Sequence, residues 1–287
     1  MDGAVRKTAI VTGGASGMGR ALCERLGRRG VAVLVADIDE GGARTVADGV
    51  RAEGGVAESL KVDVSDADSV QALIRHAVER GGRLDYLFNN AGVVVAGDQR
   101  EIGLAEWRRL FGVNFWGALH GSKFAYDVMA RQGAGHIVNT ASIAGLMPSP
   151  MNTPYCASKY AIVGLSLSLR AEGRDLGVKV SVVCPGLVLT NIFRNGVFHG
   201  PTAADILAHV PVRGISPDRA AEHILRGVDR NRAIICFPLH ARLVWWLYRH
   251  LPGLYGALAL ASVRKFRALR HLKADTSPDE RRDGTGG

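Results

Sequence analysis

The apolar residues of the chain fall into two patterns that alternate from the N-terminus to about residue 237. Short runs such as 8–11 and 31–36 are almost wholly apolar, which is typical of strands buried on both faces of a parallel sheet. Between these runs, apolar residues recur every three or four positions, as on the buried face of a helix. The two patterns predict strands at 7–12, 31–36, 57–62, 84–89, 135–141, 178–184 and 232–236, and helices at 17–29, 40–53, 67–80, 103–132, 154–175 and 217–229. Such alternation predicts an α/β fold, with a doubly wound parallel sheet of about seven strands and helices on both faces.

The same pattern indicates how the 287 residues divide. It continues to its end as one unit, so residues 1–237 are predicted to form a single domain. Residues 186–214 interrupt it as a loop of a length that is usually either functional or disordered. Residues 238–273 are predicted to form a basic, amphipathic helical extension whose two helices meet at Pro252, and residues 274–287 to be disordered.

The net charge of +9 arises in one segment of the chain. From Arg230 to Ala274 there are nine Lys or Arg residues and no acid, so the remainder sums to zero. The domain itself therefore has no basic field that would bind nucleic acid. In the extension, the longest stretch without Arg, Lys or His is 251–263, which is too short to span a bilayer. Two interpretations stay open: the extension packs over the substrate site or a neighbouring subunit, or it makes peripheral contact with a membrane.

Cysteine spacing and the first residues bear on the compartment. The cysteines at 23, 156, 184 and 236 are scattered without a Cys-x-x-Cys pair, which predicts neither a metal site nor a disulfide framework. Residues 1–7 contain no apolar core of a signal peptide. We therefore expect a cytoplasmic location, with membrane association as the variant that the extension allows.

A glycine-rich turn between the first strand and the first helix predicts a nucleotide site. Residues 12–19 read Thr-Gly-Gly-Ala-Ser-Gly-Met-Gly. Glycines permit a tight turn and a close approach of the backbone to a diphosphate, whose charge the following helix N-terminus attracts. This is the context of a Rossmann-like dinucleotide-binding fold, where ligands bind beyond the carboxyl ends of the strands.

The second strand ends in Asp37, at a spacing where a carboxylate can bind the adenosine ribose. A carboxylate there would repel a 2′-phosphate, and neither Lys nor Arg occurs in the glycine-rich turn, so NAD is favoured over NADP. Asp37 could instead cap the next helix, although Asp39 could equally fill that position.

Tyr155 and Lys159 lie one helical turn apart and so share a face. A phenol has an unperturbed pKa of about 10. A neighbouring ammonium favours phenolate and should lower that pKa, which makes the pair a candidate acid–base catalyst.

Together with further motifs, these features resemble the short-chain dehydrogenase/reductase family from about residue 6 to about residue 237. The other matching motifs are Asp63-Val64, Asn89-Asn90-Ala91-Gly92, Asn114, Ser142, Pro185-Gly186 and Thr190. The resemblance implies a catalytic set of Asn114, Ser142, Tyr155 and Lys159 and no metal. It implies cofactor contacts at Gly13, Ser16, Gly17, Met18, Gly19, Asp37, Ile38, Asp63, Val64, Asn90, Ala91, Gly92, Tyr155, Lys159, Pro185, Gly186, Val188 and Thr190.

The resemblance also implies a reaction, the reversible oxidation of a secondary alcohol to a ketone with NAD. Tyr155 would take the hydroxyl proton, Ser142 would hold the same oxygen, Lys159 would tune Tyr155 and bind the nicotinamide ribose, and Asn114 would hold a water that relays the proton. Apolar residues in the loop favour a bulky hydrophobic substrate, such as a steroid, terpenoid or polyketide; they are Leu187, Ile192, Phe193, Val197 and Phe198. In that loop only Arg194 and Arg213 could bind an acidic group, and His199 is interpreted as a structural residue.

Two other functions stay open. One is an NADPH-dependent reductase of carrier-bound 3-ketoacyl chains, which Asp37 disfavours. The other is a nucleotide-binding regulatory protein without catalysis, which the complete catalytic set disfavours. The resemblance further implies a homo-oligomer, a dimer or tetramer, that pairs through the helices carrying Asn114 and Tyr155.

Overall fold

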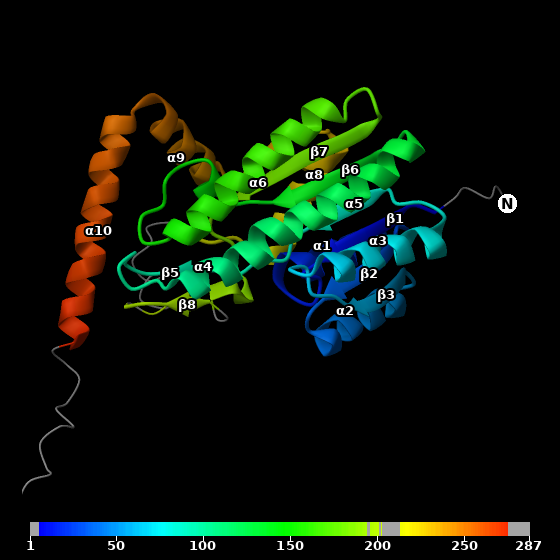
Figure 1. Ribbon diagram of the computed structural model, residues 1–287, viewed down its shortest axis with the longest axis horizontal. Coiled ribbons are helices and arrows are strands. Elements are labelled where there is room, and N and C mark those ends of the chain that lie inside the picture. Colours follow the sequence, from blue (N-terminus) through cyan, green and yellow to red (C-terminus); the bar gives the residue numbers. More distant parts are fainter. Residues whose placement is uncertain (1–5, 194–195, 201, 203–212, 275–287) are drawn as a thin grey trace, which may run out of the picture.

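The computed structural model, which describes residues 6–193, 196–200, 202 and 213–274, contains one parallel sheet of seven strands (Figure 1). In spatial order the strands are β3 (Val56–Lys61), β2 (Ala32–Asp37), β1 (Thr8–Thr12), β4 (Tyr86–Asn89), β6 (Gly135–Thr140), β7 (Val178–Pro185) and β9 (Ile234–Phe237). The order reverses between β1 and β4, so the carboxyl ends of these two strands flank a switch point where ligands bind. The predicted α/β fold is confirmed.

Helices cover both faces of the sheet (Figure 1). One face carries α1 (Gly17–Arg28), α2 (Glu40–Ala52) and α8 (Pro217–Asp229), and the other carries α3 (Ala67–Gly81), α5 (Gly117–Gln132) and α6 (Thr153–Glu172). The central strand β1 shows why both faces are needed, because all five of its residues are buried. Burial on both sides is what a run without polar alternation predicts.

The predicted continuous helix 103–132 is wrong in its middle. The structure has α4 (Leu104–Phe111), a π-helical turn η1 (Gly112–Trp116) and then α5. In the wide turn, the Asn114 side chain accepts from the Val93 backbone N–H at 2.8 Å and donates to the Val93 carbonyl at 3.0 Å. These bonds are compatible with the extra residue in the turn, and such turns occur often at functional sites.

Part of the predicted loop 186–214 has regular structure. A short strand β8 (Val197–Phe198) pairs in parallel with β5 (Val95–Ala96), and Asn191–Phe193 forms a 3₁₀ turn. These pieces are too short to show a periodicity. The side chain of Phe193 and all of Arg194 lie outside the described part, whereas Arg213 is exposed.

The C-terminal extension consists of α9 (Leu239–His250) and α10 (Pro252–Ala274), which meet at Pro252. Figure 1 shows α10 as a rod along one end of the molecule. Two of the described side chains of α10 form hydrogen bonds to the domain: the Tyr255 hydroxyl donates to the Pro148 carbonyl, and Arg267 donates to Asp98 at 3.0 Å. The predicted disordered segment lies outside the described residues, apart from Ala274, which ends α10. Within the described ranges, we find no helix with the length and apolar character needed to cross a bilayer.

Candidate active site

The glycine-rich turn is held against the end of β4 by Thr12 and Asn90. The Thr12 hydroxyl accepts from the Asn90 backbone N–H at 3.0 Å and from that of Ala91 at 3.2 Å. The Asn90 side-chain amide donates to the Thr12 carbonyl at 3.1 Å and to the Gly13 carbonyl at 3.3 Å. Bonds within the protein therefore hold the turn to the end of β4. Gly13 and Gly17 have φ of 63° and 54°, values that favour glycine.

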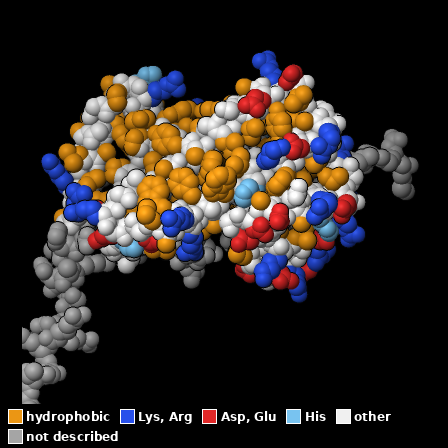
Figure 2. Space-filling view, viewed as in Figure 1, with side chains coloured by type: hydrophobic (Ala, Val, Ile, Leu, Met, Phe, Trp, Pro, Cys, Tyr) orange, Lys and Arg blue, Asp and Glu red, His pale blue; other side chains and the backbone are white. Residues whose placement is uncertain are grey.

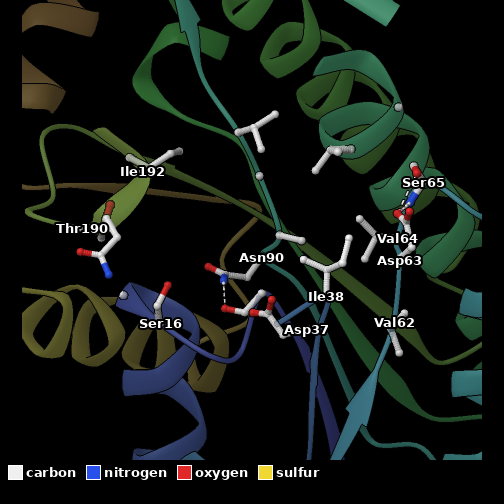
Figure 3. Close-up of a pocket in the computed structure, with 18 of the residues that line it drawn as sticks. Ser16, Asp37, Ile38, Val62, Asp63, Val64, Ser65, Asn90, Thr190 and Ile192 are labelled. Atoms are coloured by element: carbon white, nitrogen blue, oxygen red, sulfur yellow. Dashed lines mark hydrogen bonds between the residues drawn. The ribbon is translucent and has the colours of Figure 1, made fainter. Parts of the chain in front are cut away.

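A cavity of about 550 Å³ lies beyond these strand ends. Figure 3 shows Ser16 and Thr190 on one side, Asp63, Val64 and Ser65 on the other, and Asn90 between them. Twelve of the predicted cofactor residues line it, namely Gly13, Ser16, Gly17, Met18, Asp37, Ile38, Asp63, Val64, Asn90, Ala91, Gly92 and Thr190. The structure thus brings together most of the set that the sequence predicts for the nucleotide.

Six other predicted cofactor residues do not line this cavity; Tyr155 and Lys159 are described below with the catalytic group. Gly19 packs beneath the turn, and Pro185 ends β7. Val188 is buried and forms a bridge with Ile215. Gly186 follows at the same sheet edge and packs against the start of α9.

The two acids after β2 have separate roles in the structure. Asp39 caps α2, because its side chain accepts from the Gly42 N–H at 3.0 Å. Asp37 lines the cavity, where it accepts from the backbone N–H of Ala15 at 2.9 Å and of Asp39 at 3.0 Å. The interpretation of Asp37 as the helix cap is therefore wrong, and its carboxylate stays available at the cavity wall.

Ser142, Tyr155 and Lys159 come together at the end of β6. Ser142 follows this strand and caps a 3₁₀ turn, with its hydroxyl accepting from the Ala144 N–H at 3.2 Å. Lys159 on α6 is only 3% exposed, and its ammonium donates to the Thr140 carbonyl at 2.9 Å. The same ammonium lies 5.5 Å from the centre of the Tyr155 ring. A hydroxyl, a phenol and an ammonium therefore share one site.

Asn114 joins this group through the backbone. A Cβ placed on Gly92 would lie 3.3 Å from Asn114 Oδ1 and 3.6 Å from Lys159 Nζ, so both side chains meet at Gly92. Asn114 Nδ2 also donates to the Ser158 hydroxyl at 3.2 Å. The side chain thus ties η1 to the segment after β4 and to α6. Its water-holding role stays a prediction.

Burial controls the two titrating groups of the site. It raises the pKa of Tyr155 above its usual value, while the Ser142 hydroxyl, as a hydrogen-bond partner, acts in the opposite direction. It lowers the pKa of Lys159 to about 8. The expected lowering of the Tyr155 pKa is therefore wrong for this structure, since the cost of burying a phenolate exceeds the effect of the groups that favour it.

Among the residues at or near the site that the sequence analysis missed, three carry basic side chains. Arg108 and Arg109 of α4 line the cavity with exposed side chains. Arg108 and Arg109 lie four residues before Gly112 and Val113, a spacing that puts residues on one face of a regular helix. The π turn breaks that periodicity. The third is His240 of α9, whose buried Nε2 has no hydrogen-bond partner among the described residues and lies 3.4 Å from where a Gly186 Cβ would be. Nothing in the sequence indicates this contact. His199, in contrast, bonds Glu106 at 2.8 Å, as a structural residue does.

Comparison with known proteins places this arrangement in a family. Residues 7–197 match the family model described as short chain dehydrogenase. The putative oxidoreductase SadH of Mycobacterium tuberculosis is 31% identical over 265 residues, which covers 91% of this chain and 96% of SadH. The probable oxidoreductase EphD of the same organism is 32% identical over 269 residues, or 90% of this chain, but this chain spans only about half of EphD (45%).

Two further proteins carry more informative descriptions. The meso-2,3-butanediol dehydrogenase of Serratia marcescens is 38% identical over 188 residues, covering 65% of this chain and 73% of that protein. The crystal structure of a short chain dehydrogenase/reductase from Burkholderia phymatum, in complex with NAD, superimposes with a TM-score of 0.79. It is 32% identical, and the match covers 87% of this chain and 95% of that one.

Proposed function

The chain belongs to the short-chain dehydrogenase family, and from this we propose that it oxidises a secondary alcohol on a bulky hydrophobic substrate to a ketone, reversibly and with NAD. That it is an oxidoreductase of this family follows from the match over 7–197. The observation that carries the finer proposal is the meeting of Ser142, Tyr155 and Lys159 beside the cavity. The butanediol dehydrogenase, which resembles this chain, is named for a small secondary alcohol, and it supports the type of alcohol but not the size of the substrate.

In the proposed reaction the chain's residues position one oxygen and move one proton. Tyr155 takes the hydroxyl proton of the alcohol, and Ser142 donates a hydrogen bond to the same oxygen. The Lys159 ammonium, held by the Thr140 carbonyl, provides positive charge next to the phenol ring. Donors fixed in place before the reaction lower its barrier, because they need no reorganisation as charge develops on the oxygen.

The residues around the cavity fit NAD. Asn90 Oδ1 is a buried acceptor without a partner in the described structure. The glycine-rich turn leaves backbone exposed at a helix N-terminus, as a diphosphate requires. Asp37 would hold the adenosine ribose, Asp63 and Val64 the adenine, and Lys159 the nicotinamide ribose. When bound, the nicotinamide accepts the hydride that the alcohol carbon gives up.

Removing the charge of Asp37 is expected to relax the choice of cofactor. Asp37→Asn keeps a side-chain oxygen for the Ala15 N–H but no longer repels a 2′-phosphate. The ratio of kcat/KM for NAD to that for NADP should fall by about ten- to a hundredfold, which corresponds to about 1.4–2.7 kcal/mol. Steady-state kinetics with both cofactors measure this. Asp39→Asn, at the exposed helix cap, is the matched control and should leave the ratio unchanged. An unchanged ratio in Asp37→Asn would show that Asp37 does not select the cofactor.

One observation favours a second candidate, a reductase of carrier-bound 3-ketoacyl chains. Arg108 and Arg109 line the cavity, and none of the described acids pairs with them, so they could meet a phosphate of a carrier. Asp37 argues against the NADPH that this reaction ordinarily uses.

The test is a panel of substrates with both cofactors. Purified protein would be assayed for NADH formation from steroid, terpenoid and aliphatic secondary alcohols, and for NADPH consumption with 3-ketoacyl thioesters. We expect oxidation of at least one cyclic or bulky alcohol, with NAD preferred. Turnover confined to thioesters with NADPH would establish the second candidate. Binding of NAD without turnover of any substrate would leave the non-catalytic alternative.

We also propose that the chain forms a homo-oligomer through the helices carrying Asn114 and Tyr155. Large side chains are exposed there, namely Trp116, Tyr160 and Leu167. Figure 2 shows apolar side chains gathered over this part of the surface. Burying them against a second copy would remove that apolar area from water.

A further inference from the structure

The helices α9 and α10 and the residue between them, Leu251, are here called the arm, and they expose an unusual share of the protein's large apolar side chains. Seven of the fifteen such residues exposed in the described structure belong to the arm. They are Leu239, Leu243, Trp246, Leu251, Leu254, Leu258 and Leu260. Because an extensive exposed apolar surface on a folded protein usually marks a binding site, we expect the arm to bind a partner.

The exposed residues of α9 lie along one side of the helix. Leu239, Leu243 and Trp246 are four and three positions apart, and Trp246 is 55% exposed. The opposite side is used for packing, since Ala241 is buried and Trp245 contacts the core beside α6. The exposure of Leu239, Leu243 and Trp246 is therefore not the result of loose packing of α9.

The first half of α10 repeats this division. Leu254 and Leu258 are exposed and one turn apart, while Tyr255 between them turns inward to the Pro148 carbonyl. Arg267, farther along, donates to the buried carboxylate of Asp98. The helix is thus fixed on its inner side and apolar on its outer side.

Cations accompany the apolar row. Arg242 and Arg249 lie next to it on α9, and Arg264 and Lys265 follow on α10. All four are exposed, and no acid of the described residues pairs with them. In Figure 2 most of the acidic side chains in view lie on the half of the molecule away from the arm. The partner should therefore combine an apolar layer with negative charge.

We propose that the outer face of the arm binds the surface of a membrane that contains anionic phospholipid. Leu239, Leu243, Trp246, Leu254 and Leu258 would enter the boundary between headgroups and acyl chains, and the arginines and Lys265 would meet lipid phosphates. None of the described helices could cross the bilayer, so the arm lies on it. A second copy of the chain is a less favourable partner for this surface. A two-fold interface pairs a surface with itself and would bring these cations close to each other.

The position of the arm also bears on the substrate, a step that rests on the proposed function. Tyr255 contacts Pro148, which lies in the segment between Ser142 and Tyr155. Membrane bound to the arm would therefore lie near the segment that carries the reacting groups. A hydrophobic alcohol dissolved in the lipid would have a short path to them.

Vesicle sedimentation of the full chain tests the proposal without any use of activity. Vesicles of equal parts phosphatidylcholine and phosphatidylglycerol should bind the protein at least about tenfold more tightly than phosphatidylcholine alone, and added salt should weaken the binding. Dibrominated phosphatidylcholine in the anionic vesicles should quench the Trp fluorescence, and Trp246→Phe should lose most of that quenching. Protein that stays in the supernatant with anionic vesicles at low salt overturns the proposal.

Matched surface variants locate the contact. The double variant Leu243→Glu/Leu258→Glu should bind anionic vesicles at least about tenfold more weakly. Leu176→Glu, at an exposed leucine outside the arm, should bind as the wild type does. If both variants bind vesicles equally weakly, or if both bind as the wild type does, the assignment of the contact to the arm is wrong. Light scattering tests whether the partner is a second copy instead. If the wild type does not bind vesicles, and the double variant has a lower molecular mass in solution than the wild type, a second copy is the partner. None of these readouts depends on the proposed chemistry, so they fail or succeed separately from it.

Discussion

Tyr155→Phe is expected to lower kcat for alcohol oxidation by about 10²–10⁴-fold, the usual contribution of a general acid–base group. The substitution removes one oxygen and keeps the ring next to the Lys159 ammonium. No other described side chain at this position could replace the phenol, since Ser142 is a far weaker acid. NAD affinity should change little, because the cavity is lined by other residues. Kinetics of NADH formation and calorimetric titration with NAD measure the two effects.

Tyr160→Phe is the matched control for this prediction. Tyr160 lies on the same helix, one and a half turns farther along, with its ring partly exposed. The same atom is removed there, so any general cost of losing a tyrosine hydroxyl from α6 appears in the control. Retention of even a tenth of the wild-type rate in Tyr155→Phe would mean that another group moves the proton.

The pKa shifts give this reaction a definite pH dependence. Oxidation requires Tyr155 without its proton, and burial raises its pKa, so the oxidation rate should rise as the pH rises toward that value. Lys159, whose pKa is lowered to about 8, is charged below that pH and loses its support for phenolate above it. Because the two groups interact, a profile of kcat/KM reports the pair rather than either residue. A rate that falls as the pH rises from 6 to 8 would contradict the base role of Tyr155.

The parts of the structure that follow from local sequence were the ones that could be predicted. The run 8–11 is buried on both faces, and a wholly apolar strand has no other stable place in a parallel sheet. The glycine-rich turn, Asp37, Asn90 and Ser142 all lie at or just after the carboxyl ends of strands, so their convergence on one edge follows from parallel topology alone. For these residues, a place at the end of a strand is enough to determine where they lie in the fold.

Features that depend on distant contacts could not be predicted. The π turn at Asn114 exchanges bonds with Val93, and the same residues fit a continuous helix equally well by periodicity. Pairing of β5 with β8 joins segments about a hundred residues apart with two residues each. The raised pKa of Tyr155 comes from burial, which a spacing of two residues on one helix does not reveal. The tertiary environment decides each of these.

Gly19→Ala is expected to abolish measurable NAD binding, and with it turnover, although Gly19 does not line the cavity. A Cβ at this position would lie 2.0 Å from the Gly13 carbonyl oxygen and 2.7 Å from Asn90 Nδ2. Neither neighbour can yield easily, because the Asn90 amide itself holds the Gly13 carbonyl at 3.3 Å. The methyl group must displace the turn from the end of β4. Since overpacking of this kind typically costs about 1–3 kcal/mol, stability should fall as well.

Gly49→Ala separates this steric effect from the general effect of the substitution. Gly49 lies within α2 on the exposed side, and beyond its own turn of helix none of the described residues has an atom within 4 Å of where its Cβ would be. There alanine should stabilise the protein by about 0.5–1 kcal/mol, the difference in helix propensity, and leave NAD binding unchanged. Calorimetric titration with NAD and chemical unfolding of both variants give the comparison. If Gly19→Ala bound NAD within a few-fold of the wild type, the close packing of the glycine-rich turn against the end of β4 would not be what holds the diphosphate. Because the test removes no polar group, its result bears on the shape of the turn alone.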